Sequence, residues 1–150
     1  MPDRAEALMP YIFSMLRWTM LLIAVGTILG ARWADYSWGR FWGWDPKEVW
    51  ALVTLLFYII VLHGRVARWY GSFGLMLGAQ FGAIAIIMTW YGANVIFKSG
   101  RHAYGGADTS FATWLVIGFI AANLLWGFLA VLRLILQKTI ADSRAYLHRK

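Results

Sequence analysis

The sequence contains no cysteine, only three prolines and only seven acidic residues. Without cysteine, the chain can have no disulfide framework, no thiolate metal site and no thiol chemistry of its own. Charged residues make up 14% of the 150 residues, whereas hydrophobic residues make up 61%. This balance lies well outside the composition of soluble globular domains. The chain is therefore predicted to be an integral membrane protein with a single domain.

Basic residues outnumber acidic ones by fourteen to seven, which gives a formal net charge of +7. In a soluble protein, such an excess would suggest a nucleic-acid partner. Here the basic residues lie in short segments between apolar runs and at the C-terminal end, which is the pattern of membrane topology. We therefore expect no nucleic acid among the partners of this chain.

Four apolar stretches are long enough to cross a bilayer as helices, which need about 20 residues each. They cover about residues 11–31, 46–63, 73–97 and 111–132, and a basic tail follows over residues 137–150. The sequence thus predicts an all-α integral membrane protein with a tryptophan-rich outer loop between its first and second helices. The distribution of Lys and Arg favours cytoplasmic termini and a cytoplasmic tail. The tryptophan loop and the 98–112 loop would then lie together outside.

Glycines recur every four residues on two of the expected helices. Gly74, Gly78 and Gly82 lie on the third helix, and Gly26 and Gly30 lie on the first. Small residues at this spacing let helix backbones approach closely in lipid. Helix packing within the chain is the favoured interpretation, with a dimer face or a ligand groove as the alternatives.

Half of the ten tryptophans lie in the run WADYSWGRFWGWDPKEVW, between the first two apolar stretches. They are Trp33, Trp38, Trp42, Trp44 and Trp50. The cluster is larger than membrane anchoring alone requires. Flat aromatic rings separated by glycines favour a flat, largely apolar ligand over an ion or a sugar.

The end of this run carries a helix-start signal. Asp45 is a suitable N-cap, Pro46 suits the first helical turn, and Glu48 completes a capping-box arrangement. The structural interpretation of Asp45 is favoured, and it leaves room for a role in function because the cap fixes where the preceding tryptophans point. An acid–base pair is disfavoured because cap geometry already occupies both carboxylates.

The three histidines lie in different settings. His148 lies in the basic tail and is interpreted as a solvated residue. His63 ends the second apolar stretch, where an interfacial residue beside basic neighbours and a ligand are equally open interpretations. His102 lies in a glycine-rich loop on the same expected side as the tryptophans, which makes it a candidate axial ligand for a haem iron.

The segment from Trp38 to Leu52, followed by His63, closely resembles the tryptophan-rich haem-handling signature of the cytochrome c assembly family. The continuation WDPKE-x-WAL, the approach from Gly30 to Ala34 and the later run from His102 to Gly105 resemble the CcsA/ResC branch, of system II cytochrome c biogenesis. The related CcmC and CcmF branches share the tryptophan signature and differ after the aspartate. The resemblance covers about residues 20–136.

The resemblance implies a membrane component that presents haem b, as the transported and attached substrate, at the outer face for covalent attachment to the CxxCH motif of apocytochrome c. Matched by position, His102 and His63 correspond to axial ligands of an outer and a transmembrane haem iron. The residues that correspond to the platform under the outer haem are Trp38, Trp42, Trp44 and Asp45. The cations near the platform, which we expect to pair with the haem propionates, are Arg40, Lys47 and Arg101.

The resemblance also implies a bacterial cytoplasmic or thylakoid membrane, and a CcsB/ResB-type membrane partner. The chain would be part of a holocytochrome c synthase complex rather than a self-contained enzyme. Family members are longer and place further histidines upstream, so His63 and His102 supply one ligand to each of two haems. We therefore expect this chain to be the C-terminal portion of the family fold, and the missing N-terminal half to be a partner.

Other functions stay open at this point. Within the family, the chain could export haem to a separate chaperone, as in the CcmC branch, or be an incomplete fragment without activity of its own. A transporter or channel subunit would be expected to carry charged or broken mid-span helices, for which Arg17 alone is a weak indication. An anchor subunit of a respiratory complex would be expected to pair histidines at mid-membrane depth in two helices.

Overall fold

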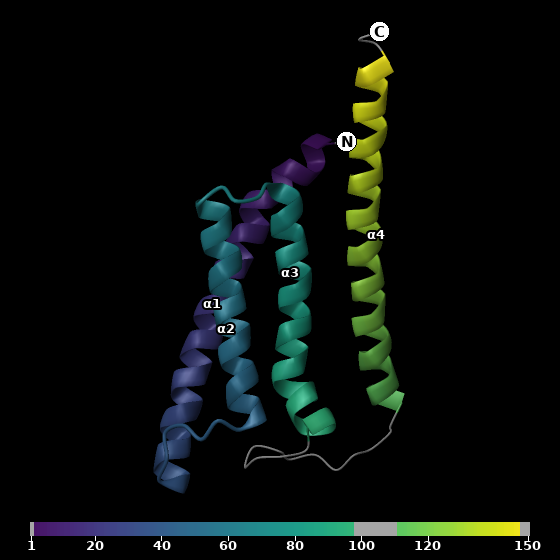
Figure 1. Ribbon diagram of the computed structural model, residues 1–150. Helices are drawn as coiled ribbons and strands as arrows, with labels where there is room; N and C mark the ends of the chain where they lie inside the picture. The colour runs from purple at the N-terminus through teal and green to yellow at the C-terminus, as the bar shows by residue number, and fades with distance from the viewer. Residues whose placement is uncertain (1, 98–110, 148–150) are drawn as a thin grey trace. The chain divides into compact units, whose positions relative to one another are not determined.

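The computed structural model describes residues 2–97 and 111–147, and every regular element in these two ranges is a helix. Figure 1 shows how the helices follow one another along the chain. Their bounds are Pro2–Trp38 for α1, Pro46–Val66 for α2, Ser72–Ile87 for α3, Met88–Phe97 for the π-helix η1, and Phe111–Leu147 for α4. Four helical stretches, with α3 and η1 counted together, are long and apolar enough to cross a membrane. The predicted fold class is confirmed.

The helices extend beyond the apolar stretches that predicted them. α1 continues past residue 31 to Trp38, so Trp33 and Trp38 lie on its last turns rather than in the connection. α4 likewise continues through most of the basic segment to Leu147. Where the membrane surfaces cross these helices stays a prediction.

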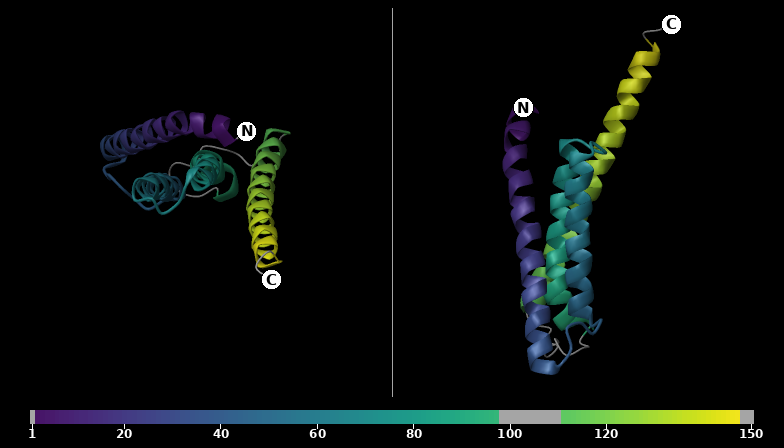
Figure 2. Two further views of the ribbon diagram at one scale, coloured as in Figure 1. Left: turned by 90° about the horizontal axis from the view of Figure 1, so that it is seen from above. Right: turned by 90° about the vertical axis from the view of Figure 1, so that its left-hand side faces the viewer.

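The chain divides into two compact units, and each is described by itself. The first is a three-helix unit, in which α1, α2 and α3 with its continuation η1 pack against one another (Figure 2). The second contains α4. Buried side chains from all three helices form the core of the three-helix unit: Met9, Leu16, Tyr58, Val61, Leu62 and Leu75.

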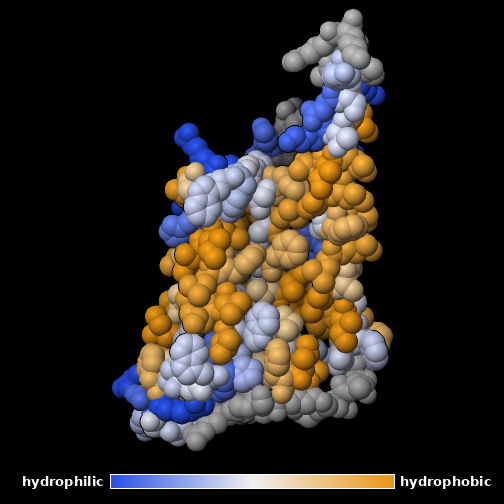
Figure 3. Space-filling view, viewed as in Figure 1, coloured by the Kyte–Doolittle hydropathy of each residue, from blue (hydrophilic) through white to orange (hydrophobic). Residues whose placement is uncertain are grey.

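Most apolar side chains of the three-helix unit lie on its surface rather than in its core. Leu22, Ile28 and Ile60 are all more than half exposed. Figure 3 shows apolar side chains over the middle of these helices and hydrophilic ones toward both of their ends. This pattern fits a bundle with a lipid-facing surface.

The glycine stripe of α3 packs against α2 and the turn that follows it. A Cβ atom added to Gly74 would lie 2.7 Å from the Tyr70 ring, and one added to Gly78 would lie 2.6 Å from Val61 Cγ1. At Gly82 the added Cβ would lie 2.7 Å from the Tyr58 ring. The predicted role of these three glycines in helix packing is confirmed, because any side chain there would collide with α2 or the turn.

Tyr70 links the turn between α2 and α3 to the body of α2. Its phenol donates a hydrogen bond to the backbone carbonyl of Val61. Burial raises the pKa of the Tyr70 phenol, although a backbone hydrogen bond and the charge of Arg65 act in the opposite direction. The phenol therefore stays protonated at neutral pH and keeps its donor.

Two threonines join α2 to the point where α3 changes into the π-helix. Thr54 is 1% exposed, and its hydroxyl donates to the Ala85 carbonyl at 3.0 Å. Thr54 Oγ1 also lies 2.8 Å from Thr89 Oγ1, and the Thr89 hydroxyl lies 3.1 Å from the Trp50 carbonyl. These bonds fix η1 against the first half of α2, which forms one side of the site described next.

Candidate functional site

The connection between α1 and α2 carries the central part of the tryptophan run, over residues 39–45. Gly39 has a φ of +67°, and its N–H donates to the Asp35 carbonyl at 2.9 Å, which ends α1. Trp44 has a φ of +57° although it is not glycine, and its side chain is 70% exposed. A bulky residue rarely adopts this backbone region unless the surrounding structure imposes it. The connection therefore holds Trp44 outward in a strained conformation.

The N-terminus of α2 supplies the groups that fix this connection. Asp45 is the N-cap, as predicted, and its side chain accepts from the Glu48 N–H at 3.3 Å. Glu48 is buried, and its carboxylate reaches back beyond the cap to accept from the Gly43 N–H at 2.6 Å. The first turn of α2 thus fixes two residues of the connection: Asp45 at its end, and Gly43 between Trp42 and Trp44.

Arg40 folds back over the same connection. Its Nη2 lies 3.5 Å from Asp45 Oδ2, and the side chain of Asp45 is only 6% exposed. The Arg40 guanidinium also occupies the space where a Cβ of residue 43 would lie, so a larger residue at this position would displace the arginine side chain. The described contacts of Arg40 support the connection, and its expected pairing with a haem propionate stays a prediction.

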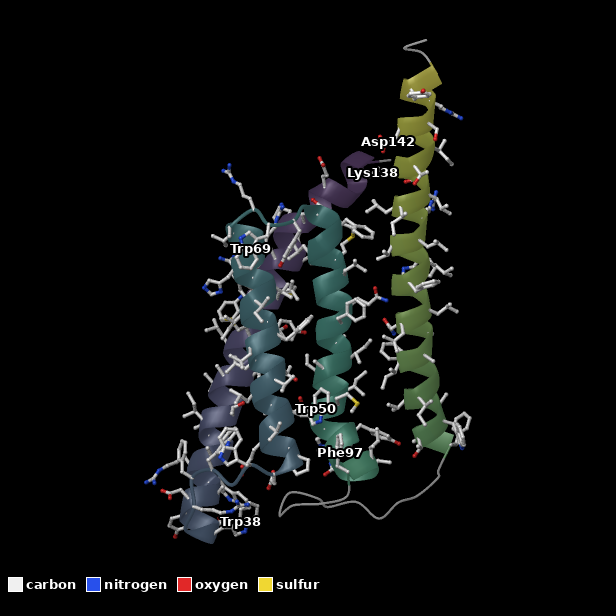
Figure 4. The ribbon with its side chains drawn as sticks, viewed as in Figure 1. Trp38, Trp50, Trp69, Phe97, Lys138 and Asp142 are labelled. Carbon is white, nitrogen blue, oxygen red and sulfur yellow. The ribbon has the colours of Figure 1, made fainter. Side chains whose placement is uncertain are left out.

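The tryptophans form edge-to-face pairs rather than one continuous flat layer. Trp33 and Trp38, both on α1, have ring centroids 5.0 Å apart at an interplanar angle of 76°. Trp42 and Trp44 lie 5.9 Å apart at 86°. Trp50 lies on α2, and its ring is 6.4 Å from that of Phe97 on η1. Figure 4 shows both residues toward the Trp38 end of the unit.

A mostly apolar cavity of about 300 Å³ lies beside Trp42, between α1, α2 and the start of η1. Its α1 wall is made mostly of small residues, among them Gly26, Gly30 and Ala34. Among the described residues, a Cβ added to Gly26 or Gly30 would have no neighbour within 4 Å. These two glycines therefore do not serve close helix packing as we predicted; they line a ligand-sized groove. The charged residues at the cavity are Lys47 and Glu48, and Thr89 lines it from η1.

His63 lies near the other end of α2, about 27 Å from Asp45 at 1.5 Å per helical residue. Its side chain is exposed, and its Nδ1 lies 2.8 Å from the Ile59 carbonyl. If Nδ1 carries the proton of this hydrogen bond, Nε2 presents a lone pair outward. Metal-binding histidines usually have this arrangement. His63 therefore does not belong to the cavity beside Trp42 but to a separate position.

The other expected iron ligand, His102, lies outside the described residues, as do Arg101, expected to pair with a propionate, and His148, interpreted as solvated. Over residues 2–97 and 111–147, no group of three His, Cys, Asp or Glu side chains gathers in a way that could hold a metal ion. The described part of the chain thus offers one imidazole, that of His63, and no complete metal centre.

Three contributors to the site were not identified from the sequence alone: the Gly43 bond of Glu48, the contact of Arg40 with Asp45, and Thr89. A partial signal existed for two of them. Arg40 and Gly43 flank Trp42 at a spacing of three residues, and Glu48 follows Asp45 by three. For Thr89 no signal existed, because its partners Thr54 and Trp50 lie on another helix, more than thirty residues away in the sequence.

Comparison with known proteins finds one matching family model and several curated relatives. The family model described as Cytochrome C assembly protein matches residues 3–100. The cytochrome c biogenesis protein CcsA of Synechococcus sp. (strain WH7803) is 40% identical over 104 residues, which cover 69% of this chain and 32% of that protein. CcsA of Rippkaea orientalis is 44% identical over 85 residues, or 56% of this chain and 24% of that protein.

A third relative is Protein NrfI of Wolinella succinogenes, which is 38% identical over 90 residues, or 59% of this chain and 10% of that protein. The chain thus spans about a third or less of the length of these curated relatives. No solved structure matches the chain.

Proposed function

The chain belongs to the cytochrome c assembly protein family, and from this premise we propose that it holds haem b on its tryptophan connection and presents it for attachment to the CxxCH motif of apocytochrome c. The membrane class and the family agree with a component of cytochrome c biogenesis. Three points belong to the proposal: where haem binds, which protein accepts it, and the orientation of the tryptophan connection toward the outside.

The observation that carries the proposal is the cavity whose walls are Trp42 on one side and Gly26 and Gly30 on the other. A porphyrin is a flat apolar ring with two carboxylates at one edge. Aromatic side chains offer large apolar contact surface to such a ring, and helix positions without a Cβ let its edge approach the backbone. Lys47 at the cavity is placed to pair with a propionate. The strained, exposed Trp44 extends the aromatic surface beyond the cavity.

The two histidines are assigned to separate haem positions. His63, with its Nδ1 bonded to the Ile59 carbonyl, would offer Nε2 to an iron at the end of α2 distant from Trp42. His102 would be the ligand beside the tryptophan connection. Each position then needs a second imidazole from elsewhere, which we assign to the rest of the longer protein or to a CcsB/ResB-type partner.

This arrangement assigns positioning rather than acid–base catalysis to the chain. Asp45 and Glu48 are both engaged in fixing the connection. Holding a haem vinyl group against an incoming cysteine thiol converts an encounter in solution into a reaction between neighbours. The chain is therefore proposed to act as part of a holocytochrome c synthase complex.

The proposal is tested in the assembled biogenesis system by replacing Trp42 with alanine and His102 with alanine separately. Covalent haem on a co-expressed apocytochrome c is measured by haem staining after denaturing electrophoresis. Both variants are expected to lower attached haem severely at equal protein level. Trp18→Ala is the matched control, because Trp18 is exposed on α1 and does not line the cavity. Normal attachment in both variants would refute the proposed platform.

A further inference from the structure

A second cavity, of about 1040 Å³, lies at the end of the three-helix unit opposite the tryptophan connection. It is formed by the first turns of α1, the end of α2 and the turn that leads into α3. Figure 4 shows Trp69 in this turn and Trp38 at the far end of the unit. We propose that this cavity binds the headgroup of an anionic phospholipid.

Two basic residues, Arg65 and Arg68, line the cavity, and Glu6 is the acidic residue among the described residues of its wall. Neither arginine forms an ion pair with a side chain that the structure describes. Guanidinium groups bind phosphate oxygens through paired hydrogen bonds. The cavity therefore has a net positive charge and the donors that suit a phosphodiester.

The other half of the cavity is apolar. Met9 and Phe13 line it from α1, and Val66 lines it from α2. Pro10, inside α1, also lies in the wall, and the ribbon of α1 bends in its first turns (Figure 1). A free inorganic anion would leave this apolar surface unused, whereas a phospholipid fills it with the first carbons of its acyl chains. Basic pockets between membrane helices bind anionic headgroups in this way.

The backbone at Arg68 gives independent support. α2 ends with the Trp69 N–H bonded to the Gly64 carbonyl at 2.9 Å and the Arg68 N–H bonded to the Arg65 carbonyl at 3.2 Å. This is the Schellman arrangement, whose left-handed residue is usually glycine. Here Arg68 occupies that position with a φ of +60°. Glycine would adopt this backbone conformation without strain. An arginine at this position therefore indicates that the arginine side chain has a function.

The surroundings of the cavity support a position at the depth of lipid headgroups. Trp69 is 73% exposed in the turn, and an exposed indole beside arginines is typical of a membrane–water interface. The first turn of α3 begins at Ser72, after Gly71, which provides no side-chain cap, so the positive end of the helix dipole adds to the same field. The cavity and its two arginines carry the proposal without this contribution.

Native mass spectrometry of the full chain in a neutral detergent tests the proposal. Equal amounts of dioleoylphosphatidylglycerol and dioleoylphosphatidylcholine are added, and the lipid retained on the protein is counted. The unmodified chain is expected to retain the phosphatidylglycerol with a preference of about tenfold or more, because this lipid has a net negative charge for the two arginines, whereas the choline group cancels the phosphate charge of the other lipid. The Arg65→Gln/Arg68→Gly variant is expected to lose this preference and retain both lipids alike.

Arg68→Gly alone separates binding from folding. Glycine suits the left-handed position, so the thermal midpoint measured by circular dichroism is expected to stay level or rise while lipid preference falls. Arg144→Gln on α4 is the matched control and is expected to leave the preference unchanged. Equal retention of both lipids by the unmodified chain, or an unchanged preference in the double variant, would overturn the proposal. So would displacement of the lipid by equimolar glycerol phosphate, because the apolar half would then contribute nothing.

Discussion

Trp44 is the residue at which local conformation and the proposed function meet most directly. A side chain in the left-handed region costs roughly 1–2 kcal/mol relative to the ordinary helical region. The conformation persists because Asp45 caps α2 on one side and Gly43 is bound by Glu48 on the other. The ring that results is mostly exposed, so burial does not offset the strain. Contact with a ligand is the compensation that we infer.

This leads to a prediction for Trp44→Gly. Glycine removes the strain, so the unfolding midpoint in detergent is expected to stay level or rise slightly. Haem attachment in the assembled system is expected to fall, because the outer part of the aromatic surface is lost. Trp44→Ala, which keeps the strain and removes the ring, is the comparison: it should lose attachment without any gain in stability. Full attachment in both variants would remove Trp44 from the platform.

Some contacts of this connection could be predicted from the sequence and others could not, and the difference has a physical reason. The cap at Asp45 could be predicted because a cap involves only the next three residues and has a characteristic composition. The fit of Arg40 over Gly43 could not, because it depends on the path of an irregular connection and on the direction of a long side chain, which residue type alone does not specify. Trp38, Trp42, Trp44 and Asp45 stay predicted platform residues, of which the structure places Trp42 at the cavity.

At the scale of elements, two glycine stripes with the same spacing have opposite roles. On α3 the stripe receives Tyr70, Val61 and Tyr58, whereas Gly26 and Gly30 on α1 line open space. Sequence spacing shows that a face is made of small residues, and it does not show whether a neighbouring helix fills the space. The four helical stretches, by contrast, follow from length and hydropathy alone, which is why the predicted fold class is confirmed.

The two stripes give a paired prediction. Gly78→Ala is expected to destabilise the fold by about 1–3 kcal/mol, because its Cβ would lie 2.6 Å from Val61 Cγ1. Gly30→Ala meets no neighbour within 4 Å and should leave stability level or raise it by up to about 1 kcal/mol through helix propensity. It narrows the cavity, however, so haem attachment is expected to decline. Equal unfolding midpoints for the two variants would contradict this division of roles.

At the scale of the whole molecule, charge and cavities differ between the two ends of the three-helix unit. One end has the tryptophan connection with a mostly apolar cavity, and the other has Arg65, Arg68 and a half-polar cavity. The cytoplasmic placement of the arginine end stays a prediction from the Lys and Arg distribution. With that placement, a lipid headgroup site would face the cytoplasmic leaflet, and a haem platform would face the compartment where apocytochrome c is matured.

The number of axial histidine ligands that the whole chain can offer to haem iron gives the last prediction. His63 and His102 lie on different segments and are assigned to different haems, so each iron would receive a single imidazole from this chain. Purified alone, the chain is therefore expected to bind haem weakly, as followed by absorption spectroscopy. Millimolar free imidazole should raise the bound fraction by supplying the missing ligand. His63→Ala should remove part of this rescue, whereas His148→Ala, the matched histidine control, should retain all of it. Stoichiometric bis-histidine haem in the unmodified chain without added imidazole or partner would show that the chain completes its own ligand sets.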